Sequence, residues 1–174
     1  MRHFCLLMAA MLFSVMAFAQ QMDADFTQTR VLKASGKTTH MQGHIVYDGN
    51  DQLSMVYSDP EGDYFIIDGS LVKINLLNKK SELNADKVKA VSLQRATLLN
   101  CLSGQWEQAA VDNNADTVVE EKDGFRNILI KTKGKVPRGG YSSVDLTYRL
   151  ADGMLTRMVL EEAAGVVNTY ELSH

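Results

Sequence analysis

The chain has few of the residues that hold small folds together through disulfides or bound metal ions. It contains 2 cysteines and 4 histidines in 174 residues. Cys5 lies in the apolar stretch at the N-terminus, so Cys101 has no partner for a disulfide within the rest of the chain. The fold therefore has to be stabilised by the burial of apolar side chains.

An excess of charge of one sign is also absent. The chain has 18 Lys and Arg against 21 Asp and Glu, which gives a net charge of −3. A mildly acidic surface does not attract the phosphate backbone of nucleic acids. Nucleic acid is therefore not an expected partner.

Long apolar runs are absent after residue 19. Before it, Arg2 and His3 precede an apolar run over residues 4–18, which closes with the small-x-small pattern Ala17-Phe18-Ala19. The run is shorter than the roughly 20 residues of a membrane-spanning helix. This pattern predicts a secretory signal peptide over residues 1–19, cleaved after Ala19. The alternative is an uncleaved anchor that lies in the membrane interface.

No cysteine stands at the predicted cleavage site, so we expect a mature chain that carries no lipid of its own. Removing 19 of the 174 residues leaves 155, and because Arg2 is the only charged residue lost, the net charge changes from −3 to −4. A chain of this size is long enough for a substantial core. We expect residues 20–174 to form a single domain.

Patterns that support catalysis are missing as well. His40 and His44 would lie on one face of a strand but ~13 Å apart, too far to share a metal ion. The sequence has neither a Gly-x-Ser-x-Gly nor a His-Glu-x-x-His motif. The adjacent acids Glu120 and Glu121 would point to opposite faces of a strand. We therefore expect no catalytic residue, no metal site and no cofactor.

The strongest pattern that is present is a series of alternating segments separated by turns. Asp-Gly occurs at 48–49, 68–69, 123–124 and 152–153, and this dipeptide favours tight β-hairpin turns. Alternation between apolar and polar residues predicts antiparallel strands with one wet face. Strands are expected near residues 26–34, 38–47, 52–58, 63–67, 70–77, 79–83, 106–110, 116–121, 125–132, 143–150, 154–162 and 166–173.

One segment has helical spacing instead. Between Asp86 and Gly104 the apolar residues fall at roughly three-to-four spacing, and Gly104 is a typical residue to end a helix. These apolar residues are Val88, Val91, Leu98, Leu99 and Leu102. The sequence therefore predicts a mainly β fold, in which a curved or half-closed antiparallel sheet carries one amphipathic helix on its apolar face. The interior is either a core filled by side chains or an apolar cavity with the helix as a lid.

The order of several landmarks resembles a known family. Phe26-Thr27-Gln28 is followed by a strand that begins at Gly43, an aromatic strand that ends near Pro60, and an apolar strand that ends in Asp68-Gly69. This order resembles the periplasmic outer-membrane lipoprotein carriers, the LolA-like proteins. The resemblance implies an unclosed antiparallel β-barrel of about eleven strands, with a helix that covers a concave apolar face.

The resemblance also implies a function without chemistry. Family members act as soluble chaperones of the periplasm: they bind the acyl chains of lipoproteins released from the inner membrane and deliver them to the outer membrane. The implied partners are acylated lipoproteins, an inner-membrane lipoprotein-releasing transporter and an outer-membrane receptor, and we expect a monomer. By alternation and family position, the residues expected to line the lipid cavity are Ile45, Leu53, Met55, Tyr57, Leu98 and Leu102.

Three features set this chain apart within the resemblance. The better-known carriers have a basic residue followed by Pro after the Gly-led strand, where this chain has Gly49-Asn50. Those carriers begin with a helix of several turns, whereas the expected cleavage leaves only residues 20–25 before Phe26. The last expected strand is followed by none of the family's C-terminal extension, as expected of a short, divergent member. The alternative function is a lipid-sensing or protein-interaction module of the same fold, and an enzyme is the third hypothesis. The basic loop over residues 131–141 either contacts head groups or faces water.

Overall fold

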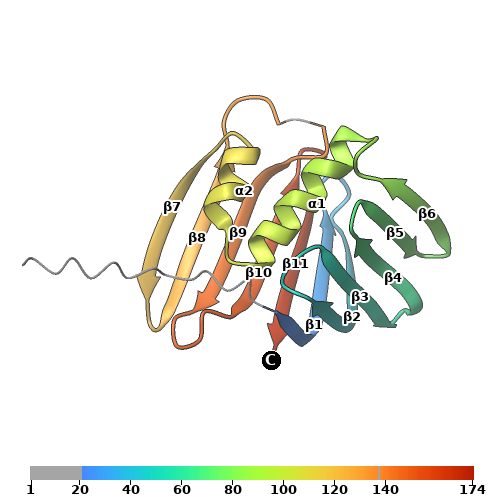
Figure 1. Cartoon of the computed structure of the whole chain (residues 1–174), viewed down its shortest axis with the longest axis horizontal. Helices are drawn as coiled ribbons and strands as arrows, with labels where there is room; N and C mark the ends of the chain where they lie inside the picture. Colours follow the sequence, from blue (N-terminus) through green and yellow to red (C-terminus); the bar gives the residue numbers. More distant parts are fainter. Residues whose placement is uncertain (1–20, 137) are drawn as a thin grey trace, which may run out of the picture.

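The computed structural model describes residues 21–136 and 138–174, so the predicted signal peptide lies outside the described residues. The described chain forms one sheet of 11 antiparallel strands and two helices, which confirms the mainly β prediction (Figure 1). Neither helix is long and apolar enough to cross a membrane. The elements are β1 (Met22–Leu32), β2 (Lys37–Tyr47), β3 (Gln52–Asp59), β4 (Glu61–Asp68), β5 (Leu71–Leu76), β6 (Lys79–Asn84), α1 (Lys89–Leu102), α2 (Trp106–Asp112), β7 (Ala115–Lys122), β8 (Phe125–Thr132), β9 (Tyr141–Arg149), β10 (Leu155–Glu162) and β11 (Val166–Ser173).

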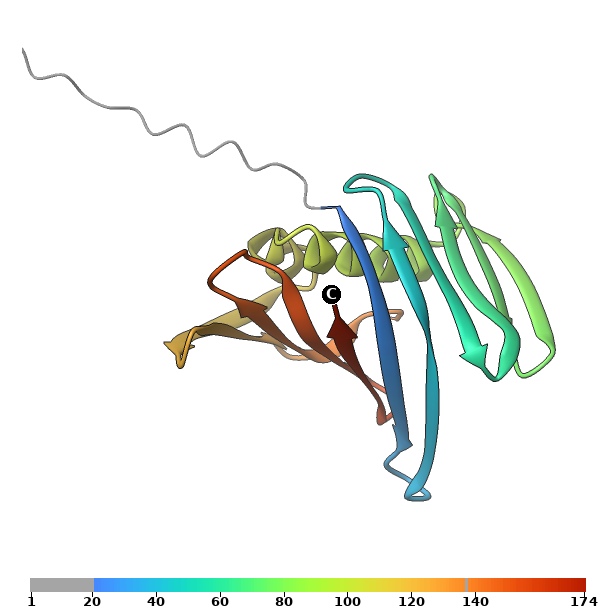
Figure 2. The ribbon, with the colours of Figure 1, turned by 90° about the horizontal axis from the view of Figure 1, so that it is seen from below.

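The sheet consists of two meanders joined at one seam. Its strand order is β6-β5-β4-β3-β2-β1-β11-β10-β9-β8-β7, so the first strand pairs with the last. Strands β6 and β7 form the two edges and do not pair with each other, which leaves the barrel unclosed. Figure 2 shows the sheet bending around helix α1, which runs along its concave side. The helices therefore cover the face that the open sheet leaves unclosed.

Alternation along the strands decides which side chains face the helices. In β1, Met22, Ala24 and Phe26 are buried, whereas Asp23 and Asp25 between them are exposed. Successive side chains of a strand point to opposite faces of the sheet. The concave face is consequently apolar and the convex face polar, as the sequence pattern predicts.

The hairpin turns lie where the Asp-Gly dipeptides predict them. All four glycines of these dipeptides have positive φ, with values from 56° at Gly69 to 86° at Gly49. At the β7–β8 turn, Asp123 also has positive φ, at 53°, next to Gly124 at 82°. Two positive φ angles in a two-residue loop match the right-handed twist of the strands.

Helix α1 begins three residues later than the sequence pattern suggests and ends as predicted. Its N-cap, Val88, makes no side-chain capping bond. At the other end the amide of Gln105 donates to the carbonyl of Asn100 at 2.8 Å, and the amide of Gly104 donates to Cys101 at 3.4 Å. These two bonds, with Gly104 at a φ of +75°, form a Schellman motif that satisfies the last helical carbonyls.

The strand expected over residues 106–110 is wrong, because this segment forms helix α2. Five residues are too few to separate a strand period from a helical one. Ala109 and Ala110 favour a helix and are buried. The Asn113 side chain at the end of α2 donates to the Thr97 hydroxyl of α1 at 2.8 Å, so contact with the first helix further stabilises this conformation.

Strand β2 has a glycine, Gly43, at a position where no side chain fits. A Cβ atom at this position would lie 2.2 Å from the carbonyl oxygen of Val56 and 2.9 Å from the ring of Phe26. The β2–β3 register shifts at this point. The space lets the rings of Phe26 and Tyr57 pack edge to face with centroids 5.2 Å apart.

Replacing Gly43 with alanine should therefore overpack the sheet. We expect Gly43→Ala to lower the free energy of unfolding by about 2–3 kcal/mol in urea denaturation. Gly36→Ala is the matched control, because its Cβ meets nothing within 4 Å and only its φ of +67° is strained. The close-packing account is contradicted if the control is destabilised as much as Gly43→Ala.

His44 makes a pH-sensitive contact on the convex face. Its Nδ1 lies 2.9 Å from a carboxylate oxygen of Asp25, and its Nε2 lies 3.0 Å from one of Asp23. Only a protonated imidazole donates from both nitrogens. The hydrogen bond to Asp25 raises the pKa of His44 above 6.5; desolvation opposes this rise, and the charges of both acids add to it.

A raised pKa in the folded state gives the sign of the pH dependence. The stabilisation by His44 is fully present below about pH 6.5 and is lost as the pH rises through the folded-state pKa. An NMR titration of the His44 ring should show this raised pKa, and His44→Asn should flatten the stability–pH curve over the same range. His40→Asn is the control, because His40 contacts only the Thr29 hydroxyl. A ring that titrates at or below 6.5 would contradict this account.

Candidate functional site

A cavity of about 190 Å³ lies between helix α1 and the concave face of the sheet. Its walls come from both meanders: β1, β2, β3, β4 and β5 on one side, β9, β10 and β11 on the other, with α1 above. Most of the lining side chains are apolar. The apolar lining residues are Ile45, Leu53, Met55, Phe65, Ile74, Leu76, Leu98, Leu102, Met158 and Leu160.

All six residues expected from the sequence to line a cavity are found in this one. Ile45 and Met55 are direct register partners on β2 and β3, and Leu98 and Leu102 reach the cavity from α1. Their exposed fractions run from 1% for Ile45 to 8% for Leu98. The structure thus brings them together in one wall and its lid, while their contact with lipid stays a prediction.

Sequence reasoning missed the opposite wall. Met158 and Leu160 on β10 line the cavity, and so do Tyr141 and Tyr170 on β9 and β11. Alternation places Met158 and Leu160 on one face of β10. That this face lines the same cavity as the inward face of β3 follows only from the pairing of β1 with β11, and no local sequence pattern predicts that pairing.

A chain of hydrogen bonds crosses one end of the cavity. The Tyr57 hydroxyl donates to Gln28 Oε1 at 2.7 Å, and Gln28 Nε2 donates to Asn168 Oδ1 at 3.0 Å. Asn168 Nδ2 in turn donates to a carboxylate oxygen of Glu162 at 3.3 Å. The bonds satisfy three buried polar side chains, as the low dielectric of such a site requires. The available sequence signal was Gln28 itself, a polar residue at an inward position of an alternating strand.

Burial favours the neutral forms of the Tyr57 hydroxyl and the Cys101 thiol near the cavity. Desolvation raises the pKa of Tyr57 to about 12, with Asp63 raising it further and Arg30 opposing. Desolvation also raises the pKa of the Cys101 thiol, at 0% exposed, to about 12. Within residues 21–136 and 138–174 no group of three His, Cys, Asp or Glu side chains is placed to hold a metal ion. A mostly apolar cavity of this kind is suited to binding an apolar molecule.

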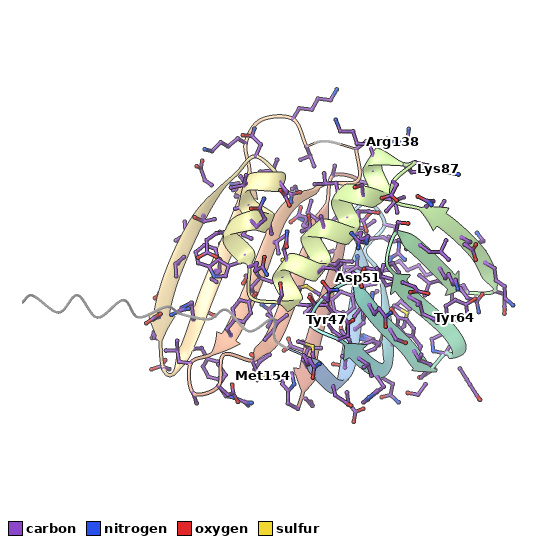
Figure 3. The ribbon with its side chains drawn as sticks, viewed as in Figure 1. Tyr47, Asp51, Tyr64, Lys87, Arg138 and Met154 are labelled. Carbon is purple, nitrogen blue, oxygen red and sulfur yellow. The ribbon has the colours of Figure 1, made fainter. Side chains whose placement is uncertain are left out.

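A few polar contacts hold α1 over the sheet. The Tyr148 hydroxyl on β9 donates to the carbonyl of Cys101 in the last helical turn at 2.6 Å. Arg95 Nε donates to the carbonyl of Gly69 in the β4–β5 turn. Tyr47 and Asp51 flank Gly49-Asn50, and Figure 3 shows Tyr47 beside the C-terminal end of α1. The helix is thus tied to turns and strands at separate points along its length.

The basic loop meets the other end of the helix. A Cβ on Gly139 would lie 2.3 Å from the carbonyl oxygen of Ala90, so the loop backbone packs directly on the first turn of α1. Lys133 forms an ion pair with Asp116 at 2.7 Å. Arg138 lies near Lys87, before the helix begins (Figure 3). The loop therefore contacts the helix and is more than a hairpin tip that faces water.

Removing one tie should loosen the helix without unfolding the sheet. We expect Tyr148→Phe to cost about 1 kcal/mol, because the carbonyl of Cys101 loses its shorter hydrogen bond and keeps only the 3.4 Å bond from Gly104. Hydrogen exchange followed by mass spectrometry should show faster exchange at the C-terminal end of α1. Tyr64→Phe is the matched control, since Tyr64 lies on the opposite face of β4 from the inward Phe65. Unchanged exchange in α1 would contradict the role given to Tyr148.

Comparison with known proteins identifies the family. The family model described as outer membrane lipoprotein carrier protein LolA matches residues 17–174. No curated protein matches the chain in sequence. Among solved structures, a LolA superfamily protein from Nitrosomonas europaea is similar at 11% identity, with 90% of this chain and 85% of that chain covered and a TM-score of 0.39.

Two further solved structures are similar over most of this chain. The lipoprotein LppX of Mycobacterium tuberculosis has 12% identity, covers 90% of this chain and 87% of its own, and gives a TM-score of 0.39. MucB of Pseudomonas aeruginosa, solved in complex with MucA, has 8% identity over 90% of this chain and 52% of its own, with a TM-score of 0.44. Since the family model matches nearly the whole sequence, the chain belongs to the LolA family of outer membrane lipoprotein carriers.

Proposed function

We propose that this protein is a periplasmic carrier that binds the acyl chains of lipoproteins released from the inner membrane and delivers them to the outer membrane. The observation that supports it is the apolar cavity of about 190 Å³ between helix α1 and the concave face of the sheet. Membership of the LolA family gives the general role in lipoprotein or lipid binding. No enzymatic step is needed for this function.

The lining suits a cargo that has to be released again. Each methylene group of an acyl chain gains ~0.8 kcal/mol when it leaves water, so an apolar host supplies the affinity. Met55 on β3 and Met158 on β10 line the cavity from the two halves of the sheet. Methionine side chains adapt to ligands of different shapes. Contacts of this kind give binding without a rigid set of hydrogen bonds to the chain.

The size of the cavity implies that the helix moves when cargo enters. A volume of about 190 Å³ is below the roughly 300–1,000 Å³ of typical ligand pockets. Helix α1 is the wall that is able to move, because its N-cap makes no capping bond and few polar contacts tie it to the sheet. The sheet strands, by contrast, are bonded to neighbours along their length. We propose α1 as the lid.

The expected partners follow from the carrier role. They are acylated lipoproteins as cargo, the inner-membrane transporter that releases them and the outer-membrane receptor that accepts them, with the carrier itself a monomer. The lid of this chain is held without a basic residue at the β2–β3 turn, where Gly49-Asn50 stands and Tyr47 donates to the carbonyl of Asn50 at 3.2 Å. Tyr148 and Arg95 supply ties from other elements instead.

A charge placed in the lid should block the cargo. We expect Leu98→Arg to weaken binding of a fluorescent triacylated lipopeptide at least ten-fold, because the acyl chain would have to share the cavity with a guanidinium group. Circular dichroism and urea unfolding report whether the sheet is retained. Leu98 is better suited than Leu102, whose exposed fraction is 1% against 8%. The matched control is Val111→Arg on α2, where the side chain is 72% exposed.

Two outcomes would contradict the carrier proposal. One is a folded Leu98→Arg protein that binds the lipopeptide as tightly as the unsubstituted protein; if that variant unfolds, Leu98→Gln makes the same test with a smaller change. The other is binding without transfer to acceptor vesicles. That second result, together with a stable protein partner, would favour the lipid-sensing or protein-interaction module.

A further inference from the structure

Three hydrogen-bond donors at the cavity have no partner in the protein. They are the guanidinium of Arg30 and the hydroxyls of Tyr141 and Tyr170, and all three residues line the cavity. Across the described ranges 21–136 and 138–174, none of these three groups forms a hydrogen bond or an ion pair. Their polar atoms keep some exposure to solvent, and a ligand that covers them has to supply hydrogen-bond acceptors in place of water.

The three donors belong to one end of the cavity. Arg30 on β1 is the register partner of Asn168 on β11, and Tyr170 lies two residues further along the same face of β11. Desolvation raises the pKa of Tyr170, with nearby Tyr141 among the groups that raise it further and Arg30 opposing. Tyr170 is therefore close to both of the other donors, and its hydroxyl stays protonated at neutral pH.

The amide acceptors at this end are already used. Gln28 Oε1 accepts from Tyr57, and Asn168 Oδ1 accepts from Gln28. Glu162 is the only acidic residue of the lining, and one of its oxygens accepts from Asn168. The protein thus leaves three donors without partners, while both amide oxygens and one carboxylate oxygen are occupied. A ligand group that completes this arrangement has to bring acceptor oxygens, and a guanidinium pairs best with a carboxylate or a phosphate.

We infer that the cavity takes an amphiphile with an anionic head group, which binds Arg30 and the hydroxyls of Tyr170 and Tyr141 while its acyl chain lies along the apolar walls. The inference rests on the proposed acyl-chain binding and adds the chemistry of the polar end. A fatty acid and a phospholipid share this chemistry, since each joins an acyl chain to an anion. Glu162 is the register partner of Tyr141, so the guanidinium of Arg30 also has to offset the repulsion between the anion and the Glu162 carboxylate.

The test compares two probes that differ only in charge: a dansyl-labelled undecanoic acid and its methyl ester. The exported protein should bind the acid more tightly than the ester. We expect Arg30→Gln to raise the Kd for the acid at least about ten-fold and to change the Kd for the ester less than two-fold. Tyr170→Phe should act in the same direction by a smaller factor. Arg157→Gln is the control, because Arg157 pairs with Glu171 on the convex face.

Each outcome decides between the two proposals. If neither probe binds the unsubstituted protein, the acyl-chain cavity and the head-group inference both fail. If the acid and the ester bind with equal Kd values, and neither Arg30→Gln nor Tyr170→Phe weakens binding of the acid more than binding of the ester, the head-group inference is overturned. The carrier proposal then still stands. If the inference holds, competition by dodecyl phosphate and by laurate shows which anion the site prefers.

Discussion

The pairing of the first strand with the last is the interaction on which the rest of the structure depends. Strands β1 and β11 are in register from Asp25 opposite Ser173 to Leu32 opposite Val166. Without this seam the chain would form two separate meanders, each with a bare apolar face. The seam makes them one curved sheet and gives the cavity walls from both halves. The Gln28–Asn168 hydrogen bond, between residues 140 positions apart, crosses it on the inside.

The open edges of the sheet explain why the helices are essential to the cavity. Because β6 and β7 do not pair, sheet closure does not protect the concave face from water. The chain between these two strands supplies α1 and α2, which cover that face. The cavity is therefore bounded on one side by an element held through a small number of polar ties. This combination of a bonded sheet and a more loosely held helix connects the fold with the proposed uptake and release of an acyl chain.

Local patterns were sufficient for the faces of strands and for one helix. Alternation in β2 and β3 placed Ile45, Leu53, Met55 and Tyr57 on one face, and helical spacing placed Leu98 and Leu102 opposite them. The same reasoning failed at residues 106–110, because a segment of five residues does not distinguish the two periods and its contact with Thr97 is tertiary.

The polar end of the cavity was beyond prediction from this sequence. Arg30 and Tyr170 are ordinary strand residues until β1 lies beside β11, and the imbalance between donors and acceptors appears only when the partners of Gln28 and Asn168 are known. The entropic cost of closing a loop rises only slowly with its length, so pairing between distant segments of a chain is possible. The local sequence contains no signal that predicts such a pairing. The fold class follows from periodicity, whereas the site depends on non-local contacts.

The central claim is that the cavity carries an acyl chain in the cell. The most direct measurement is native mass spectrometry of the protein purified from its native cells under mild conditions, followed by extraction and analysis of bound lipid. The account predicts an adduct whose mass is that of an acylated peptide, a lipoprotein or another amphiphile. A mass equal to that of the bare polypeptide, in conditions that preserve weak complexes, would contradict it.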